Sequence, residues 1–156
     1  MALPNGTVLD DFCVIDAPDW AGVLCVTPER RVAFVRQYRH GLRGDSLELP
    51  AGALEPNELP LDGARRELSE ETGFSAERWQ LLLNVSVDPA RQSGRAHFYA
   101  ALDAHASHAP RLDPSEDLET LLVPAAEVMA LVDAGRIAHG LHIAALLQAE
   151  RLGLLR

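Results

Sequence analysis

Residues 52–74 read GALEPNELPLDGARRELSEETGF, and the spacing of their glycine and charged residues is the most informative pattern in the chain. Written as a pattern it is G-x5-E-x7-R-E-U-x-E-E-x-G-U, where U is a bulky apolar residue. The positions are occupied by Gly52, Glu58, Arg66, Glu67, Leu68, Glu70, Glu71, Gly73 and Phe74. At average residue usage, such a set coincides by chance about once in 10⁹ starting points. The alternative interpretation, a helix whose acids are merely solvated, is therefore much the weaker one.

The second half of this stretch predicts a helix over residues 59–72. Pro60 suits the first turn of a helix, and Gly73 suits the position just past its end. At 100° per residue, Ala64 and Leu68 share an apolar stripe that can pack on a sheet. The helix is thus expected to bury one side and to carry its acids beside it.

Three glutamates of this helix are close neighbours. Glu67 and Glu71 are four residues apart, and Glu70 lies one turn from Glu67. Carboxylates this close repel one another unless a cation lies between them. Hard oxygen ligands suit Mg²⁺ or Mn²⁺, which can lower the pKa of a bound water and offset charge on phosphoryl oxygens.

The complete pattern resembles the box of Nudix hydrolases, and the chain is similar to that family. The resemblance implies an α/β fold (α+β in some schemes), a Nudix-type α/β/α sandwich with a mixed β-sheet. It also implies metal-dependent cleavage of pyrophosphate linkages in nucleoside diphosphates joined to another group.

The resemblance assigns roles within the box. Glu67 and Glu71 resemble direct metal ligands, and Glu70 resembles a ligand or an orienting partner. The backbone carbonyl of Ala51 resembles a further metal ligand. Arg66 is expected to hold the helix carboxylates in place rather than to touch the substrate.

A catalytic base outside the box is also implied. Residues 113–119 fit the loop that supplies it in relatives, and Glu116 is the expected base, taking a proton from metal-bound water. A solvated loop acid is the alternative for Glu116, and Glu70 is the competing base because it lies beside the metal.

Three features resemble the ADP-ribose and ADP-sugar pyrophosphatase branch of the family. They are residues 34–40 (FVRQYRH), residues 47–52 (LELPAG) and Pro89, sixteen residues beyond Gly73. The chain departs from that branch at residues 89–95, PARQSGR, which are basic where an acidic residue is common.

Four residues are candidates for substrate binding. Arg39 follows a strand whose end is expected near the pyrophosphate, and a guanidinium can bind phosphate oxygens two at a time. Glu48 could pair with Arg66 or reach a sugar hydroxyl. Arg91 and Arg95 could hold a terminal phosphate. For Arg39, an ordinary solvated side chain is the alternative.

Two aromatic residues and several histidines have less specific interpretations. Trp20 and Tyr38 could stack on adenine, but core packing is the commoner role for an aromatic residue beside a strand. His97 is expected in the core. His139 and His142 open the last helix, where a structural role is expected.

The leading hypothesis is a pyrophosphatase of ADP-ribose or a related nucleotide sugar that releases a nucleoside monophosphate and a sugar phosphate. A second hypothesis keeps the chemistry and changes the substrate to dinucleoside polyphosphates, NADH or damaged nucleotides. A third is a non-catalytic nucleotide sensor, since a fold alone permits it; such sensors usually lose box carboxylates, whereas all are present in this chain.

Composition bounds the remaining expectations. A chain of 156 residues is expected to form one domain over 1–156, with a short N-terminal strand region at 1–18. The net charge of −9, to which residues 48–71 contribute seven acids and two arginines, argues against nucleic-acid or anionic-membrane partners. With two cysteines, no metal-like spacing and no leader-like N-terminus, a cytoplasmic setting is expected. A homodimer is implied by the resemblance alone.

Apolar runs between turn residues predict the remaining elements. Strands are expected over residues 8–15, 21–26, 31–38, 46–49, 79–87, 96–102 and 118–123. Helices are expected over 124–134 and 141–152, and a mobile loop over 103–115. Cys13 and Cys25 are expected to pack within strands.

Overall fold

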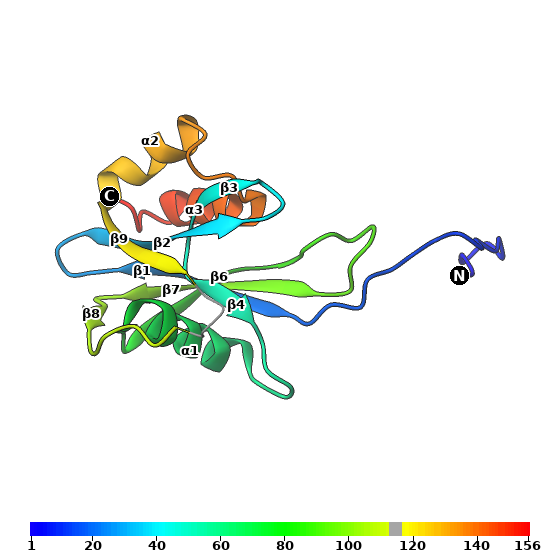
Figure 1. The fold of residues 1–156 in the computed structure, drawn as a ribbon, viewed down its shortest axis with the longest axis horizontal. Coiled ribbons are helices and arrows are strands. Elements are labelled where there is room, and N and C mark those ends of the chain that lie inside the picture. Colours follow the sequence, from blue (N-terminus) through cyan, green and yellow to red (C-terminus); the bar gives the residue numbers. More distant parts are fainter. Residues whose placement is uncertain (113–116) are drawn as a thin grey trace.

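The computed structural model describes residues 1–112 and 117–156, which form a mixed sheet with helices on both faces (Figure 1). The strands are β1 (Trp20–Val26), β2 (Arg31–Arg39), β3 (Gly44–Glu48), β4 (Ala51–Ala53), β5 (Phe74–Ser75), β6 (Arg78–Ser86), β7 (Arg95–Leu102), β8 (His105–Ala106) and β9 (Leu118–Pro124). The helices are α1 (Pro60–Thr72), α2 (Val128–Asp133) and α3 (Gly140–Arg151), with a 3-10 turn, η1 (Ala125–Glu127), before α2. The predicted combination of a mixed sheet with flanking helices is confirmed.

The sheet is organised around β1. Its strands run in the order β3-β2-β1-β7-β6, while β4 pairs with β1 and β9 pairs with β2. β1 and β7 are parallel, from the pair Trp20 and Ala96 onward, and the other pairs are antiparallel. The first residues of β1 face β4, whereas its last residues face β2. This arrangement brings the chain that leads into α1 to the middle of the sheet.

Two apolar layers hold the helices on the sheet. On the α1 face, buried Val23 and Cys25 of β1 pack in one cluster with Leu68 of α1. On the opposite face, Leu24 of β1 packs in a second cluster with Leu146 of α3. The alternation along β1 follows from the two-residue period of a strand. Burying one such side chain contributes about 1.5–3 kcal/mol.

Helix α1 begins and ends as the sequence indicates. Pro60 occupies the first turn after an extended Leu59, and Gly73 ends the helix with φ of +71° and an N–H that donates to Ser69 O at 2.9 Å. A Cβ at Gly73 would overlap the carbonyl of His108. Glycine is therefore required both by the backbone angle and by the contact.

The expected strand over residues 8–15 is wrong. Among the described residues this segment makes isolated bridges, Ala2 with Val8 and Ile15 with Gln92, and most of it is exposed. Residues 1–18 form an N-terminal arm, whose first part projects from the body (Figure 1) and whose residues 15–17 are hydrogen bonded to the segment between β6 and β7. In the part of the chain that the structure describes, residues 8–15 are not paired as a strand, and an apolar run alone does not supply a pairing partner. Cys13, which lies in the arm, is exposed, whereas Cys25 is buried in β1 as predicted.

Two further expectations need correction. The segment 103–115 was expected to lack secondary structure, but His105–Ala106 pairs with Phe74–Ser75 as strands β8 and β5. The helix expected over 124–134 is shorter, because Pro124 is extended and pairs with Arg31 as the last residue of β9. The chain then forms η1 before the α-helix starts at Val128.

Candidate active site

Helix α1 presents two nearly buried carboxylates. Its apolar stripe packs Ala64 and Leu68 against the sheet, and Glu67 and Glu71 are on the border of that stripe, 7% and 3% exposed. A carboxylate is costly to bury unless it is paired or coordinated. The helix therefore holds these two groups for interactions rather than for solvation.

Both carboxylates meet the backbone of β4. The amide N–H of Ala51 donates to Glu71 Oε2 at 3.0 Å. A Cβ at Gly52 would overlap the carboxylate of Glu67, so only glycine permits this approach. The candidate ligands Ala51, Glu67 and Glu71 are thus brought together at one point of the sheet.

Arg66 organises the acids around it. Its Nε and Nη2 donate to the two carboxylate oxygens of Glu58, each at 2.9 Å. Its Nη1 donates to Glu67 Oε1 at 2.7 Å and to Glu70 Oε2 at 3.1 Å. The guanidinium lowers the pKa of the Glu58 carboxyl, and these carboxylates raise the pKa of Arg66. Arg66 therefore neutralises part of the charge that the acids place on one another.

The donor set suits a hard divalent cation. Glu67, Glu70 and Glu71 offer carboxylate oxygens, and the peptide of Ala51 adds a carbonyl oxygen. Within residues 1–112 and 117–156, no group of three or more His, Cys, Asp or Glu side chains is gathered for metal binding. Arg66 bridges Glu67 and Glu70 instead, so metal binding requires these two carboxylates to share or leave that guanidinium.

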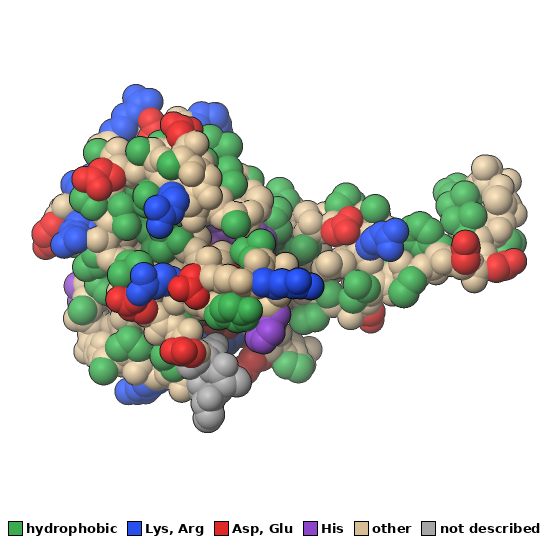
Figure 2. Space-filling model, turned by 45° about the horizontal axis from the view of Figure 1, so that its top comes forward, with side chains coloured by type: hydrophobic (Ala, Val, Ile, Leu, Met, Phe, Trp, Pro, Cys, Tyr) green, Lys and Arg blue, Asp and Glu red, His purple; other side chains and the backbone are tan. Residues whose placement is uncertain are grey.

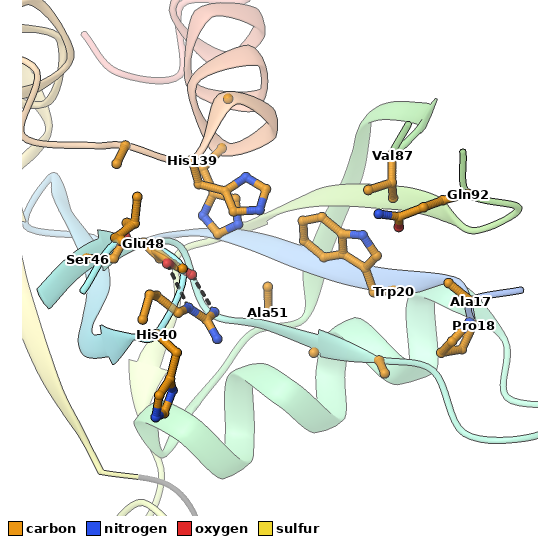
Figure 3. Close-up of a pocket in the computed structure, with 18 residues that line it drawn as sticks. Ala17, Pro18, Trp20, His40, Ser46, Glu48, Ala51, Val87, Gln92 and His139 are labelled. Carbon is orange, nitrogen blue, oxygen red and sulfur yellow. Dashed lines mark hydrogen bonds and ion pairs between the residues drawn. The ribbon is translucent and has the colours of Figure 1, made fainter. Parts of the chain in front are cut away.

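A cavity of about 770 Å³ opens on the other side of β4 (Figure 3). Its size lies within the usual range for small-molecule sites. The floor is the β4 backbone, Ala51–Ala53, and the remaining lining comes from β1, from the β2–β3 hairpin, from Val87 and Gln92, and from the start of α3. The box acids and the cavity are therefore separated by a single strand.

Arg39 and Glu48 form the charged end of the cavity. Arg39 Nε and Nη2 donate to Glu48 Oε1 and Oε2 at 2.9 and 2.6 Å. Burial acts to raise the pKa of Glu48, which is 1% exposed, yet the hydrogen bonds and the charge of Arg39 bring that pKa below its usual value. The possibility that Glu48 pairs with Arg66 is wrong. Glu48 instead fixes the orientation of Arg39.

The start of α3 contributes two histidines. His142 is buried, and its Nδ1 accepts a hydrogen bond from Leu49 N at 2.9 Å. His139 is the N-cap residue of α3, and its Nδ1 accepts from Leu141 N at 3.3 Å. Burial lowers the pKa of both rings, to about 3 for His142. The expected structural role is present, and both residues also line the cavity.

Trp20 also belongs to the cavity. It is half-buried, and its ring makes an edge contact with Phe98 at 5.2 Å between centroids. Tyr38 does not line the cavity; it is 53% exposed and stacks edge-on with His40. His97 is buried in β7, as predicted, with Nε2 3.0 Å from Asp19 Oδ2.

Two of the candidate substrate-binding residues do not line the cavity, and the candidate base cannot be placed. Arg91 and Arg95 are exposed and lie outside the cavity lining, to which Gln92 contributes instead. Arg95 Nε donates to Asn84 Oδ1 at 2.7 Å, which directs its side chain along β6. Glu116 lies outside the described residues.

The sequence reasoning missed the role of α3 in the site. His139 and His142 are spaced three apart at the start of a helix, which places them on one face. The spacing could therefore have predicted that the two histidines act together on one surface. The contact of His142 with Leu49, 93 residues earlier in the chain, does not follow from that spacing.

Among the described residues, none of the helices has the length and apolar character needed to cross a membrane.

Known proteins resemble the chain in sequence and in fold. The family described as NUDIX domain matches residues 18–144. The ADP-ribose pyrophosphatase of Bacillus subtilis (strain 168) is 31% identical over 136 residues, covering 86% of this chain and 73% of that protein. The GDP-mannose pyrophosphatase of Yersinia enterocolitica is 34% identical over 163 residues, covering 97% of this chain and 84% of that protein. A crystal structure of an ADP compounds hydrolase superposes with a TM-score of 0.77 at 23% identity over 86% of this chain and 71% of that one, which shows a shared fold.

Proposed function

The chain belongs to the NUDIX domain family, and from that premise we propose that its substrate is ADP-ribose or a related nucleotide sugar. It is a Nudix pyrophosphohydrolase. Two relatives named for ADP-ribose and GDP-mannose support a nucleoside diphosphate that carries a sugar.

One observation carries the proposal: the acids of α1 and the cavity meet at the same two residues of β4, Ala51 and Gly52. Glu71 is hydrogen bonded to the Ala51 amide, and Glu67 lies against Gly52. Ala51 and Gly52 also form the cavity floor, with Arg39 at its charged end. A pyrophosphate at this floor would lie between the acids and a guanidinium that can bind its oxygens.

The metal dependence of the family fits this donor set. We propose Mg²⁺ or Mn²⁺, held by the carboxylates of Glu67, Glu70 and Glu71 and by the carbonyl of Ala51. When bound, such a cation lowers the pKa of a coordinated water and offsets charge on phosphoryl oxygens. Arg66 would keep the acids oriented, through Glu58, as Glu67 and Glu70 turn toward the cation.

The reaction adds one water to the substrate. The water oxygen bonds to one phosphorus, and the bridging P–O bond breaks. The proton passes to a carboxylate, that of Glu116 or that of Glu70. The products are a nucleoside monophosphate and a sugar phosphate. Arg39, held by Glu48, would bind the pyrophosphate oxygens, whereas Arg91 and Arg95 would act on a terminal phosphate only if their segment moved toward the cavity.

The decisive experiment is a hydrolysis panel with Mg²⁺ and Mn²⁺. It compares ADP-ribose, other nucleotide sugars, NADH, dinucleoside polyphosphates and triphosphates, with Glu67→Gln as the inactive control. We expect the nucleotide sugars to have the highest kcat/KM. Faster hydrolysis of NADH, a polyphosphate or a damaged nucleotide would favour the second hypothesis, and binding without turnover of any substrate would favour the sensor.

Two further properties belong to the same proposal. Residues 1–156 are proposed to act as one Nudix domain in the cytoplasm, with small nucleotides rather than nucleic acids or membranes as partners. A homodimer is proposed, and the apolar side chains on the N-terminal arm, such as Phe12 and Ile15, are available for it.

A further inference from the structure

One wall of the cavity is built from three flat side chains. Trp20 stands at the start of β1, and His139 lies next to it at the start of α3 (Figure 3), where His142 also lines the cavity. The two imidazole rings lie 4.4 Å apart between centroids, tilted by 39°, and each lies 5.7 Å from the ring of Trp20. Phe98 packs behind them, 5.3 Å from His142. The wall is therefore continuous and supported by the core.

This wall is uncharged at neutral pH. Burial lowers the pKa of His139 and of His142, so both rings are neutral. The nearby charged groups, Glu48 and Arg39, act in opposite directions on both histidines and are bound to each other. A phosphate gains little from a neutral surface, whereas a planar base gains by stacking on it.

Backbone contacts fix the tautomer of each ring. Nδ1 of His139 accepts the N–H of Leu141, and Nδ1 of His142 accepts the N–H of Leu49. In a neutral imidazole the proton must then be on Nε2. His142 is 1% exposed, but His139 is half-buried and reaches the cavity. His139 therefore offers the cavity one neutral N–H donor in a fixed orientation.

The other end of the cavity has the opposite character. Arg39 is held two-fold by Glu48, and its side chain remains 44% exposed. Among the described residues its hydrogen bonds use Nε and Nη2, so Nη1 can serve a phosphate. A nucleotide has one flat neutral part and one anionic part, and the cavity has the same division.

We infer that the wall of Trp20, His139 and His142 receives the nucleobase of the substrate, a purine. His139 acts there as a specificity-determining residue that donates Nε2–H to a base acceptor. The inference rests on the proposed function in so far as the substrate is a nucleotide. Purines are favoured over pyrimidines because their larger face covers more of the wall.

Two substitutions separate the ring of His139 from its helix cap. His139→Asn keeps a side-chain acceptor for the Leu141 N–H, since Asn is a good N-cap residue, but removes the ring and Nε2–H. His139→Phe keeps a flat face and removes the donor. His105→Asn, on the exposed strand β8, is the matched control.

Binding is measured without turnover, through the fluorescence of Trp20. Trp20 and Trp79 are the two tryptophans of the chain, and Trp79 packs near Arg65 of α1, outside the cavity. In a Trp79→Phe background, AMP should change the fluorescence of Trp20, and ribose 5-phosphate should not. AMP and GMP should bind more tightly than CMP and UMP.

His139→Asn should raise the Kd of AMP about tenfold or more, the usual size of a lost base-stacking contact. The Kd of AMP for His139→Phe should lie between that of His139→Asn and that of the parent protein. The Kd for His105→Asn should equal that of the parent. The inference is overturned if ribose 5-phosphate changes the fluorescence of Trp20 as AMP does. It is also overturned if CMP and UMP bind as tightly as AMP and GMP, or if His139→Asn leaves the Kd of AMP unchanged. Because the titration needs no hydrolysis, it can succeed even if the panel finds no substrate, and it can fail while the panel succeeds.

Discussion

At the scale of single residues, the contact between Gly52 and Glu67 is the tightest constraint on the site. Replacing Gly52 with Ala would place a methyl group on the Glu67 carboxylate and push it away from β4. A displacement of about 1 Å at a catalytic group can cost about a hundredfold in rate. We expect kcat for Gly52→Ala to fall by that order, with the Tm little changed. Gly44→Ala, whose added methyl meets only an ordinary contact, is the control; equal rates for both variants would contradict the placement of Glu67.

Glu71 carries a charge that the proposed cation needs. Gln at this position can still accept the Ala51 N–H, so Glu71→Gln should fold normally and lose orders of magnitude in kcat. The measurement is kcat as a function of Mg²⁺ concentration, with exposed Glu29→Gln for comparison. A wild-type rate at saturating Mg²⁺ would remove Glu71 from the ligand set.

The catalytic base can be assigned by a pair of variants. If Glu116 accepts the proton, Glu116→Gln lowers kcat strongly and leaves the Mg²⁺ concentration for half-activation nearly unchanged. Glu70→Gln should instead change both quantities. An unchanged kcat for Glu116→Gln would transfer the base role to Glu70.

Among single residues, those inside the box were easier to predict than those around it. The carboxylates of α1 follow from helical spacing, and Gly73 follows from the need for a positive φ. The partner of Glu48 did not follow, because it depends on the register in which β2 pairs with β3, and register is not written in either strand alone.

At the scale of elements, α3 holds the segment that leads into β4. His142 accepts the N–H of Leu49, and two residues later Glu71 accepts the N–H of Ala51. The segment is thus fixed by a helix on each face of the sheet. Such a contact between distant parts of the chain arises only when both helices pack. The sequence therefore predicted α3 as a helix but did not predict that α3 belongs to the site.

His142, in α3, predicts that the stability of the folded chain depends on pH. The pKa of His142 is about 3 in the folded chain and about 6.5 when unfolded. Between these values the unfolded chain binds a proton that the folded chain does not, so the free energy of unfolding falls as the pH falls. The loss between pH 6.5 and 4 is of the order of 3 kcal/mol.

His142→Asn tests this linkage, because the Asn oxygen can replace Nδ1 as the acceptor for Leu49. Urea unfolding at pH 7 and pH 4 should show a larger loss of stability for the parent protein than for the variant. Equal losses in both proteins would show that His142 is not the group responsible.

At the scale of the whole molecule, the N-terminal arm stands apart from the body, and Figure 2 shows apolar side chains along it. Val8, Phe12 and Ile15 are each at least 44% exposed. The apolar run at residues 8–15 suggested a strand because the sequence does not say whether a neighbouring strand exists. An arm of this kind is suited to pair with another surface.

If the proposed homodimer uses the arm, deletion of residues 1–14 should convert it to a monomer in light scattering. The cut leaves Ile15, whose N–H donates to Arg91 O and whose carbonyl accepts from Ser93 N, so the body should keep its Tm. A full-length chain that is already monomeric, or a truncated chain that stays dimeric, would contradict this role of the arm.

The position of β4 has a practical consequence for protein engineering. Because this strand stands between the acids of α1 and the walls of the cavity, a library randomised at Val87, Gln92 and His139 would leave the hydrolytic machinery untouched. Selection from such a library could yield variants that hydrolyse substrates with other leaving groups while the acids of α1 stay unchanged.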